Sequence, residues 1–135
     1  MTQYQSHQGW DKFVPMKNGK YQKYSNQIVV IVNRGSKKHH SGKIYMTEHT
    51  MKVMGNPKFI EIRTSGSSVA LMKSEASDQS YAVQIPRDKS DQQVGMAHIS
   101  ASALCSAFDI QEGVYSAYFD NQMVIFNTTT IPSRL

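Results

Sequence analysis

A basic segment with a glycine near each end is the part of the sequence whose residue types best fit binding chemistry. It runs from Arg34 to Lys43 and reads RGSKKHHSGK. Arg and Lys bind phosphate groups, and hydroxyls and backbone N–H groups beside glycines position such contacts. The segment predicts a nucleic-acid-binding loop, which three more basic residues of the same half could extend. The predicted contact residues are Arg34, Lys37, Lys38, His39, His40, Lys43, Lys52, Lys58 and Arg63.

The alternative for this segment is a solvated hairpin tip whose charges only keep a strand edge from aggregating. A phosphate-binding P-loop is excluded. The spacing from Gly35 to Gly42 is too long for that motif, and Ile44 stands where the motif needs Ser or Thr.

Other chemistry finds little support in the residue spacing. The adjacent His39 and His40 would point to opposite faces of a strand, so no metal site is expected. Cys105 lies in a short apolar stretch and is expected to be a buried, inert thiol. The carboxylates are scattered at turns and form no acid–base pair. We therefore expect no cofactor and no enzymatic activity.

Length and charge narrow the class of protein further. The 135 residues suit one domain with its own core. Residues 1–74 carry twelve Lys or Arg against three acids, whereas residues 75–135 carry three against seven, which suggests that one half faces a polyanion. No apolar stretch is long enough to cross a bilayer, no signal-like segment opens the chain, and there is one cysteine. These features predict a cytoplasmic protein that does not contact membranes.

Short apolar blocks separated by turn residues predict a β-rich chain with two short helices. Thr47 and Ser100 are the expected helix caps, and the helices are expected to run to Met54 and Asp109. The expected strands are Gln27–Asn33, Lys43–Met46, Lys58–Thr64, Ser68–Lys73, Tyr81–Ile85, Gly95–Ile99, Val114–Phe119 and Met123–Asn127.

The order of these elements repeats, which predicts a duplicated β-β-α-β-β unit. Gly42 and Gly95 align at the same offset as Met51 and Leu104, and the second copy needs about two extra residues beyond its helix. We expect a domain over 27–135 with a basic repeat at 27–74 and an acidic repeat at 80–128. Residues 1–26 form an N-terminal extension, expected to dock through Trp10, Phe13, Tyr21 and Tyr24.

The first half has the order of a strand, a basic connection, a Gly-Lys-Ile strand, a capped short helix and a hairpin. The residues that carry this pattern are Val30–Gly35, Gly42–Thr47, Met51, Val53–Gly55, Phe59–Ile62 and Val69–Leu71. This unit resembles the AbrB/SpoVT-type swapped-hairpin family, and the second half, around Gly95–Thr128, is similar to a divergent second copy, as in the two-repeat MraZ branch. Thr47 and Ser100 replace the proline that the family usually has at the helix start, and the connection Arg34–Gly42 is longer and more basic than usual in the family.

The resemblance implies an α+β, β-rich barrel, usually a homodimer or higher oligomer, that regulates transcription by presenting basic loops to duplex DNA. The acidic repeat would then serve dimerisation or a partner contact. Two alternatives stay open. One is a small accessory or inhibitor protein, for example phage-encoded, that covers a site on a host protein. The other is an assembly component whose strand edges pair between chains.

Overall fold

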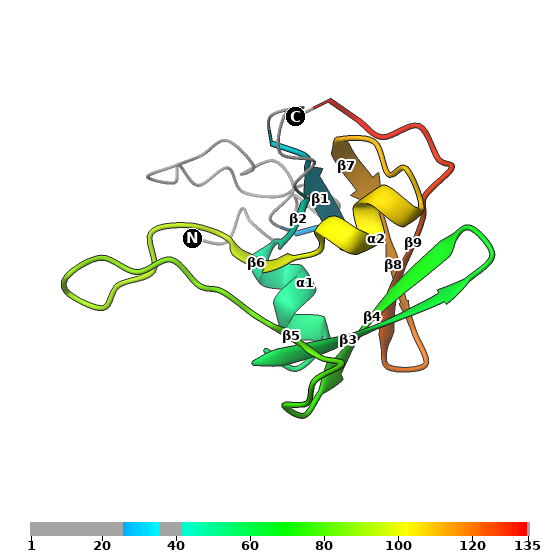
Figure 1. Cartoon of the computed structure of the whole chain (residues 1–135). Coiled ribbons are helices and arrows are strands. Elements are labelled where there is room, and N and C mark those ends of the chain that lie inside the picture. Colours follow the sequence, from blue (N-terminus) through cyan, green and yellow to red (C-terminus); the bar gives the residue numbers. More distant parts are fainter. Residues whose placement is uncertain (1–25, 36–41, 135) are drawn as a thin grey trace, which may run out of the picture.

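The computed structural model describes residues 26–35 and 42–134. These residues form nine strands and two short helices, arranged as shown in Figure 1. They are β1 (Val29–Asn33), β2 (Lys43–Met46), α1 (Glu48–Val53), β3 (Phe59–Ser65), β4 (Ser68–Ser74), β5 (Tyr81–Ala82), β6 (Ala97–Ser100), α2 (Ser102–Ala107), β7 (Gly113–Ser116), β8 (Tyr118–Asp120) and β9 (Met123–Asn127).

The first sheet is antiparallel, with the strand order β6-β2-β1-β7. Four of the five residues of β1, one of its two inner strands, are β-branched, and such residues favour a pleated, packed strand. Val30 and Val32 face the main core, and Val29 and Ile31 pack with Val114 of β7 on the opposite side. Because all four residues are at most 2% exposed, β1 is buried on both faces.

The second sheet has the order β5-β3-β4-β9-β8, and all its described pairs are antiparallel. A two-residue turn at Gly66 and Ser67 joins the long hairpin of β3 and β4. Gly66 has a φ of 59°, which glycine adopts without the strain that a side chain would add. The main core lies between the two sheets and the helices, and its largest side chains include Tyr115 and Phe126.

Strand pairs between the two halves of the chain hold the fold together. β1 pairs with β7, β2 with β6, and β4 with β9. Each pair joins a strand before residue 75 to a strand after residue 96. The predicted basic repeat and acidic repeat therefore share both sheets.

A buried pair of threonines fixes α1 against β1. Thr47 is the N-cap, and its side-chain oxygen accepts from the Thr50 N–H at 3.2 Å. Thr50 is fully buried, and its hydroxyl both donates to the Val29 carbonyl at 3.0 Å and accepts from the Val29 N–H at 3.1 Å. The first turn of α1 thus satisfies backbone groups that β1 would otherwise bury without a partner.

The β-rich, α+β character is confirmed, and three local expectations are wrong. Of the strand expected over Tyr81–Ile85, only Tyr81–Ala82 forms a strand, β5. α2 begins after Ala101, which makes no side-chain cap bond, whereas Ser100 ends β6. The strand expected over Val114–Phe119 is divided at Ala117. The Ala117 N–H still donates to the Ile28 carbonyl at 3.0 Å, next in register to the β1–β7 pairs, whereas Tyr118 begins β8 and pairs with β9 of the second sheet. The strands also form two sheets and not the closed barrel that the resemblance implied.

We expect Thr50→Val to lower the free energy of unfolding by about 2 kcal/mol or more, because it leaves two buried backbone groups of Val29 without their partner. Thr50→Ser keeps the hydroxyl and should cost about 1 kcal/mol, the value of one buried methyl group. Urea denaturation of both variants measures the difference. Equal losses in the two variants would show that the hydroxyl does not hold β1.

Candidate nucleic-acid interface

The basic connection, residues 34–43, joins β1 to β2 at one end of the first sheet. The structure describes its two ends, Arg34–Gly35 and Gly42–Lys43. Asn33 and Lys43 are directly paired, so the two ends leave the sheet side by side. The predicted contacts Lys37, Lys38, His39 and His40 lie outside the described residues.

The second end of the basic connection is attached to the start of α2. The Gly42 N–H donates to the Ser102 hydroxyl at 3.1 Å, and the Gly42 carbonyl accepts from the Ala101 N–H at 2.8 Å. A Cβ atom at Gly42 would lie 2.7 Å from the Sγ of Cys105. Only glycine therefore fits this close approach between β2 and α2 without displacing the buried cysteine.

The first end is attached to the same helix through Arg34. One guanidinium nitrogen of Arg34 donates to the Ile110 carbonyl at 2.7 Å and lies 3.3 Å from the Cys105 carbonyl. The Arg34 N–H also donates to the Glu112 carboxylate at 3.0 Å. Arginine suits this position because a positive charge is favourable near the C-terminal end of a helix. Arg34 thus has a structural contact in addition to its predicted role.

Lys43 is exposed at the end of the sheet, next to the basic connection. It points to the face opposite Ile44, which is buried in the main core. Its cross-strand neighbours are Asn33 on β1 and Ser100 on β6. This end of the sheet therefore presents a cation flanked by two uncharged polar residues.

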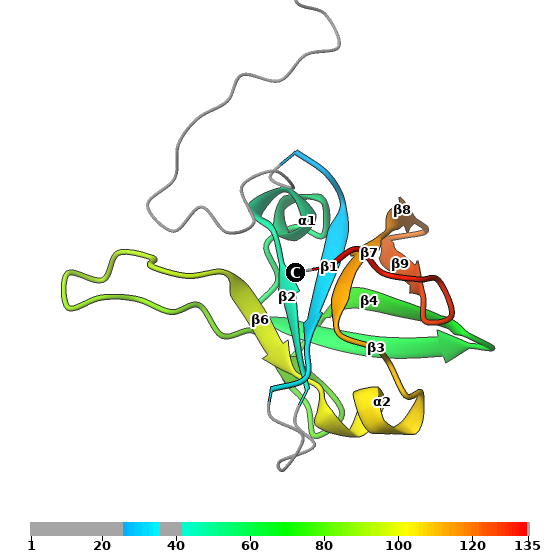
Figure 2. The same cartoon turned by 90° about the horizontal axis from the view of Figure 1, so that it is seen from above.

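The structure does not bring the other predicted cations to this end. α1 follows β2 at the opposite end of the β1–β2 hairpin, so Lys52 lies away from the basic connection (Figure 2). Lys58 precedes β3, beyond α1. Arg63 lies on β3 of the second sheet, where its guanidinium pairs with the Glu61 carboxylate.

His98 of β6 has structural neighbours. The His98 ring lies 4.9 Å from the Tyr45 ring, and its Nδ1 lies 3.2 Å from the Met96 carbonyl. Among residues 26–35 and 42–134, no group of three or more His, Cys, Asp or Glu side chains is placed to hold a metal ion.

No family model, curated protein or solved structure matches this chain. Within the described part of the chain, no helix is long and apolar enough to cross a membrane.

Cys105 lies against Gly42, at one end of the basic connection, and is fully buried. Burial raises the pKa of its thiol above the ordinary value of 9.0, and the positive charge of Arg34 only partly opposes this. Burial likewise raises the pKa of Tyr115 above 10.0. A protonated thiol is a poor nucleophile, and the Cys105 side chain is an apolar packing group of α2 against Gly42.

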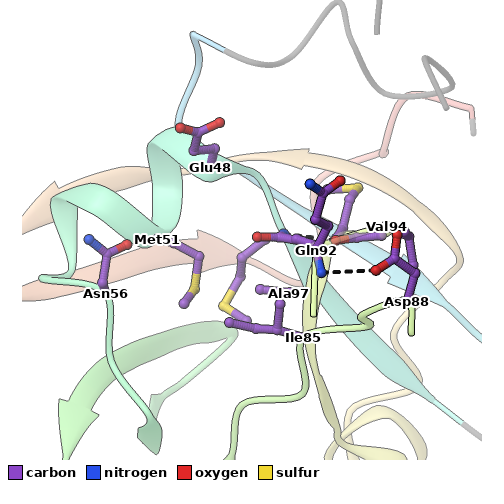
Figure 3. Close-up of a pocket in the computed structure, with 12 residues that line it drawn as sticks. Glu48, Met51, Asn56, Ile85, Asp88, Gln92, Val94 and Ala97 are labelled. Carbon is purple, nitrogen blue, oxygen red and sulfur yellow. Dashed lines mark hydrogen bonds between the residues drawn. The ribbon is translucent and has the colours of Figure 1, made fainter. Parts of the chain in front are cut away.

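A cleft beside α1 was not predicted from the sequence. It has a volume of about 450 Å³ and lies between α1 and a hairpin formed by residues 83–97, here called the arm (Figure 3). Three methionines and two carboxylates are among its lining residues. The lining residues are Met46, Glu48, Met51, Asn56, Ile85, Asp88, Gln92, Gln93, Val94, Gly95, Met96 and Ala97. The cleft depends on the pairing of β2 with β6, which no local pattern reveals.

Arg34→Ala is expected to lower the free energy of unfolding by about 1–3 kcal/mol, because the Ile110 and Cys105 carbonyls lose a charged donor. Lys43→Ala removes the same charge from an exposed position and should change stability by about 0.5 kcal/mol or less. Chemical denaturation compares the two. Equal losses of unfolding free energy in Arg34→Ala and Lys43→Ala would show that the contacts of Arg34 with the Cys105 and Ile110 carbonyls do not stabilise the fold.

We expect stability to fall as the pH rises above about 9. The Cys105 thiol ionises near 9.0 in the unfolded chain but stays protonated at higher pH when folded, so alkaline pH favours unfolding. Tyr115 adds the same effect above about 10. Denaturation at a series of pH values should show a smaller alkaline loss in Cys105→Ala than in the wild type. An unchanged alkaline slope in that variant would exclude a contribution from Cys105.

Proposed function

We propose that this protein is a DNA-binding regulatory protein of the swapped-hairpin type, in which the basic connection contacts the phosphates of duplex DNA. The attachment of both ends of that connection to α2, through Arg34 and Gly42, carries the proposal. A binding loop whose ends are fixed loses less conformational freedom when it binds. The attachment of Arg34 and Gly42 therefore favours a loop that binds DNA as well as joining two strands.

The distribution of charge supports the same surface. The described residues hold nine Lys or Arg and nine Asp or Glu side chains, so their charges cancel. The net charge of +5 resides in residues 1–25 and 36–41, which together hold six basic residues and one acidic residue. Because phosphate binding depends on a local excess of positive charge, the basic connection is the better candidate than the neutral body.

The strand registers support the duplicated unit that this proposal includes. Ile31 of β1 pairs with Tyr45 of β2, and Gln84 pairs with His98 in the same antiparallel sense. Gln84 follows Ile31, and His98 follows Tyr45, by the same number of residues. Gly95 follows Gly42 by that number as well. Tyr45 and His98 are also paired with each other across β2 and β6, as two residues on a two-fold axis would be.

A second set of strand pairs is related in the same way once the two extra residues that follow the helix of the second copy are counted. Arg63 pairs with Ala70 in the β3–β4 hairpin, and Tyr118 pairs with Ile125 in the β8–β9 hairpin at a common offset. Ala70 and Ile125 are paired with each other across β4 and β9. The axis suggested by Tyr45 and His98 thus has a counterpart in the second sheet.

Fluorescence anisotropy with a labelled duplex at two salt concentrations tests the proposal. We expect Lys37→Glu/Lys38→Glu to weaken binding by about tenfold or more and to reduce the salt slope by about 2, because each lost phosphate contact reduces it by nearly one. Lys52→Glu/Lys58→Glu makes the same charge change away from the basic connection and should weaken binding by about threefold or less.

Absence of salt-sensitive binding by the wild-type protein would exclude DNA as the ligand. Equal losses in the two double variants would show that general positive charge, and not the basic connection, governs the affinity.

A further inference from the structure

The cleft beside α1 differs in chemistry from the basic connection at the other end of the β1–β2 hairpin. Met46, Met51 and Met96 give it an apolar, polarisable lining, and Glu48 and Asp88 are the charged residues among those that line it. Its volume of about 450 Å³ is within the range of about 300–1,000 Å³ typical of ligand pockets. Such a cleft suits an aromatic side chain that is accompanied by a cation.

The arm forms one wall of the cleft and is held as a hairpin. The Val94 N–H donates to the Pro86 carbonyl, and the Asp88 N–H donates to the Gln92 carbonyl, both at 2.9 Å. Asp88 Oδ1 accepts from the Gln92 N–H at 3.0 Å, which keeps this carboxylate at the cleft (Figure 3).

Asp88 has a cation on each side of it in the chain, Arg87 and Lys89, and Arg87 contacts Asp91. Arg87 donates to the Asp91 carbonyl at 3.0 Å, and its Nε lies 3.8 Å from the Asp91 carboxylate. The negative charges at the cleft are therefore not balanced by Arg87.

We propose that Lys20–Tyr24, the KYQKY stretch of the N-terminal extension, binds in this cleft of the same chain, with its tyrosines against the methionines and its lysines near Glu48 and Asp88. The point where the extension joins the described residues supports this. The Thr47 hydroxyl donates to the Gln27 carbonyl at 3.3 Å, and Glu48 is the next residue of the chain after Thr47. The extension therefore joins the fold beside the residue that lines the cleft at the start of α1.

Reach and charge agree with this occupant. Tyr24 is two residues before Asn26, the first described residue, and an extended chain spans about 3.3 Å per residue. Residues 1–25 hold four lysines against one aspartate, so the extension and the cleft have opposite charges. The alternating lysines and tyrosines of KYQKY supply both kinds of group that the cleft lining favours.

Site-specific photo-crosslinking in the full-length protein tests this. A benzoylphenylalanine at Ile85, which lines the cleft and is 36% exposed, should cross-link within the monomer to a peptide containing residues 20–24, as mapped by mass spectrometry. The same probe at Tyr118, which is 57% exposed on β8 of the second sheet, should give about threefold less of this product or lower.

A pair of matched variants tests the role of charge. Glu48→Gln/Asp88→Asn keeps the side-chain shapes and the acceptor of Asp88, and it should lower the yield from position 85 by about threefold or more. Asp109→Asn/Asp120→Asn removes two charges that do not line the cleft and should leave the yield unchanged. Circular dichroism verifies that all variants are folded.

Three results would overturn the proposal. They are cross-links from position 85 only to residues outside 20–24, cross-links between two chains, and a yield that responds equally to the two double variants.

Discussion

The burial of β1 on both of its faces is the constraint on which the other elements depend. A strand that exposes neither face needs a partner at each edge and a covering on each side. β2 and β7 occupy its edges, and the main core covers one side. β7 comes from the second half of the chain, so the first half cannot complete this arrangement alone. The hydroxyl of Thr50 supplies the remaining bonds to Val29 and thereby fixes α1 as well.

This arrangement gives the β1–β2 hairpin two chemically different ends. α2 lies at the end of the hairpin where β1 leaves the sheet. It and the residues just after it bind Arg34 and Gly42, which lie at the two ends of the basic connection. α1 lies at the other end and forms a wall of the methionine-lined cleft with Glu48 and Asp88. The β1–β2 hairpin thus separates the basic connection from the methionine-lined cleft with its two carboxylates. We propose that the basic connection binds DNA and that the cleft binds the chain's own N-terminal extension.

The local elements could be predicted because their signals are local. β2 and β9 have the bounds that alternation and turn residues predict, and Thr47 caps α1 as expected. The pairing of β2 with β6 and of β4 with β9 could not be predicted, since sequence alternation identifies a strand but not its distant partner. For the same reason, neither the cleft nor the structural contact of Arg34 with the Cys105 and Ile110 carbonyls could be predicted. Its charge predicted phosphate binding, but the carbonyls that it binds belong to Cys105 of α2 and to Ile110 just after α2, far along the chain.

The central claim is that the α2 end of the first sheet is the nucleic-acid interface. A titration of isotope-labelled protein with duplex DNA, followed by amide chemical shifts, tests this claim most directly because it locates the contact. We expect the largest shift changes at Gly35, Gly42, Lys43 and Ser102, with the amide signals of α1 nearly unchanged. Changes concentrated on α1 and the arm, or no changes at low salt, would contradict it.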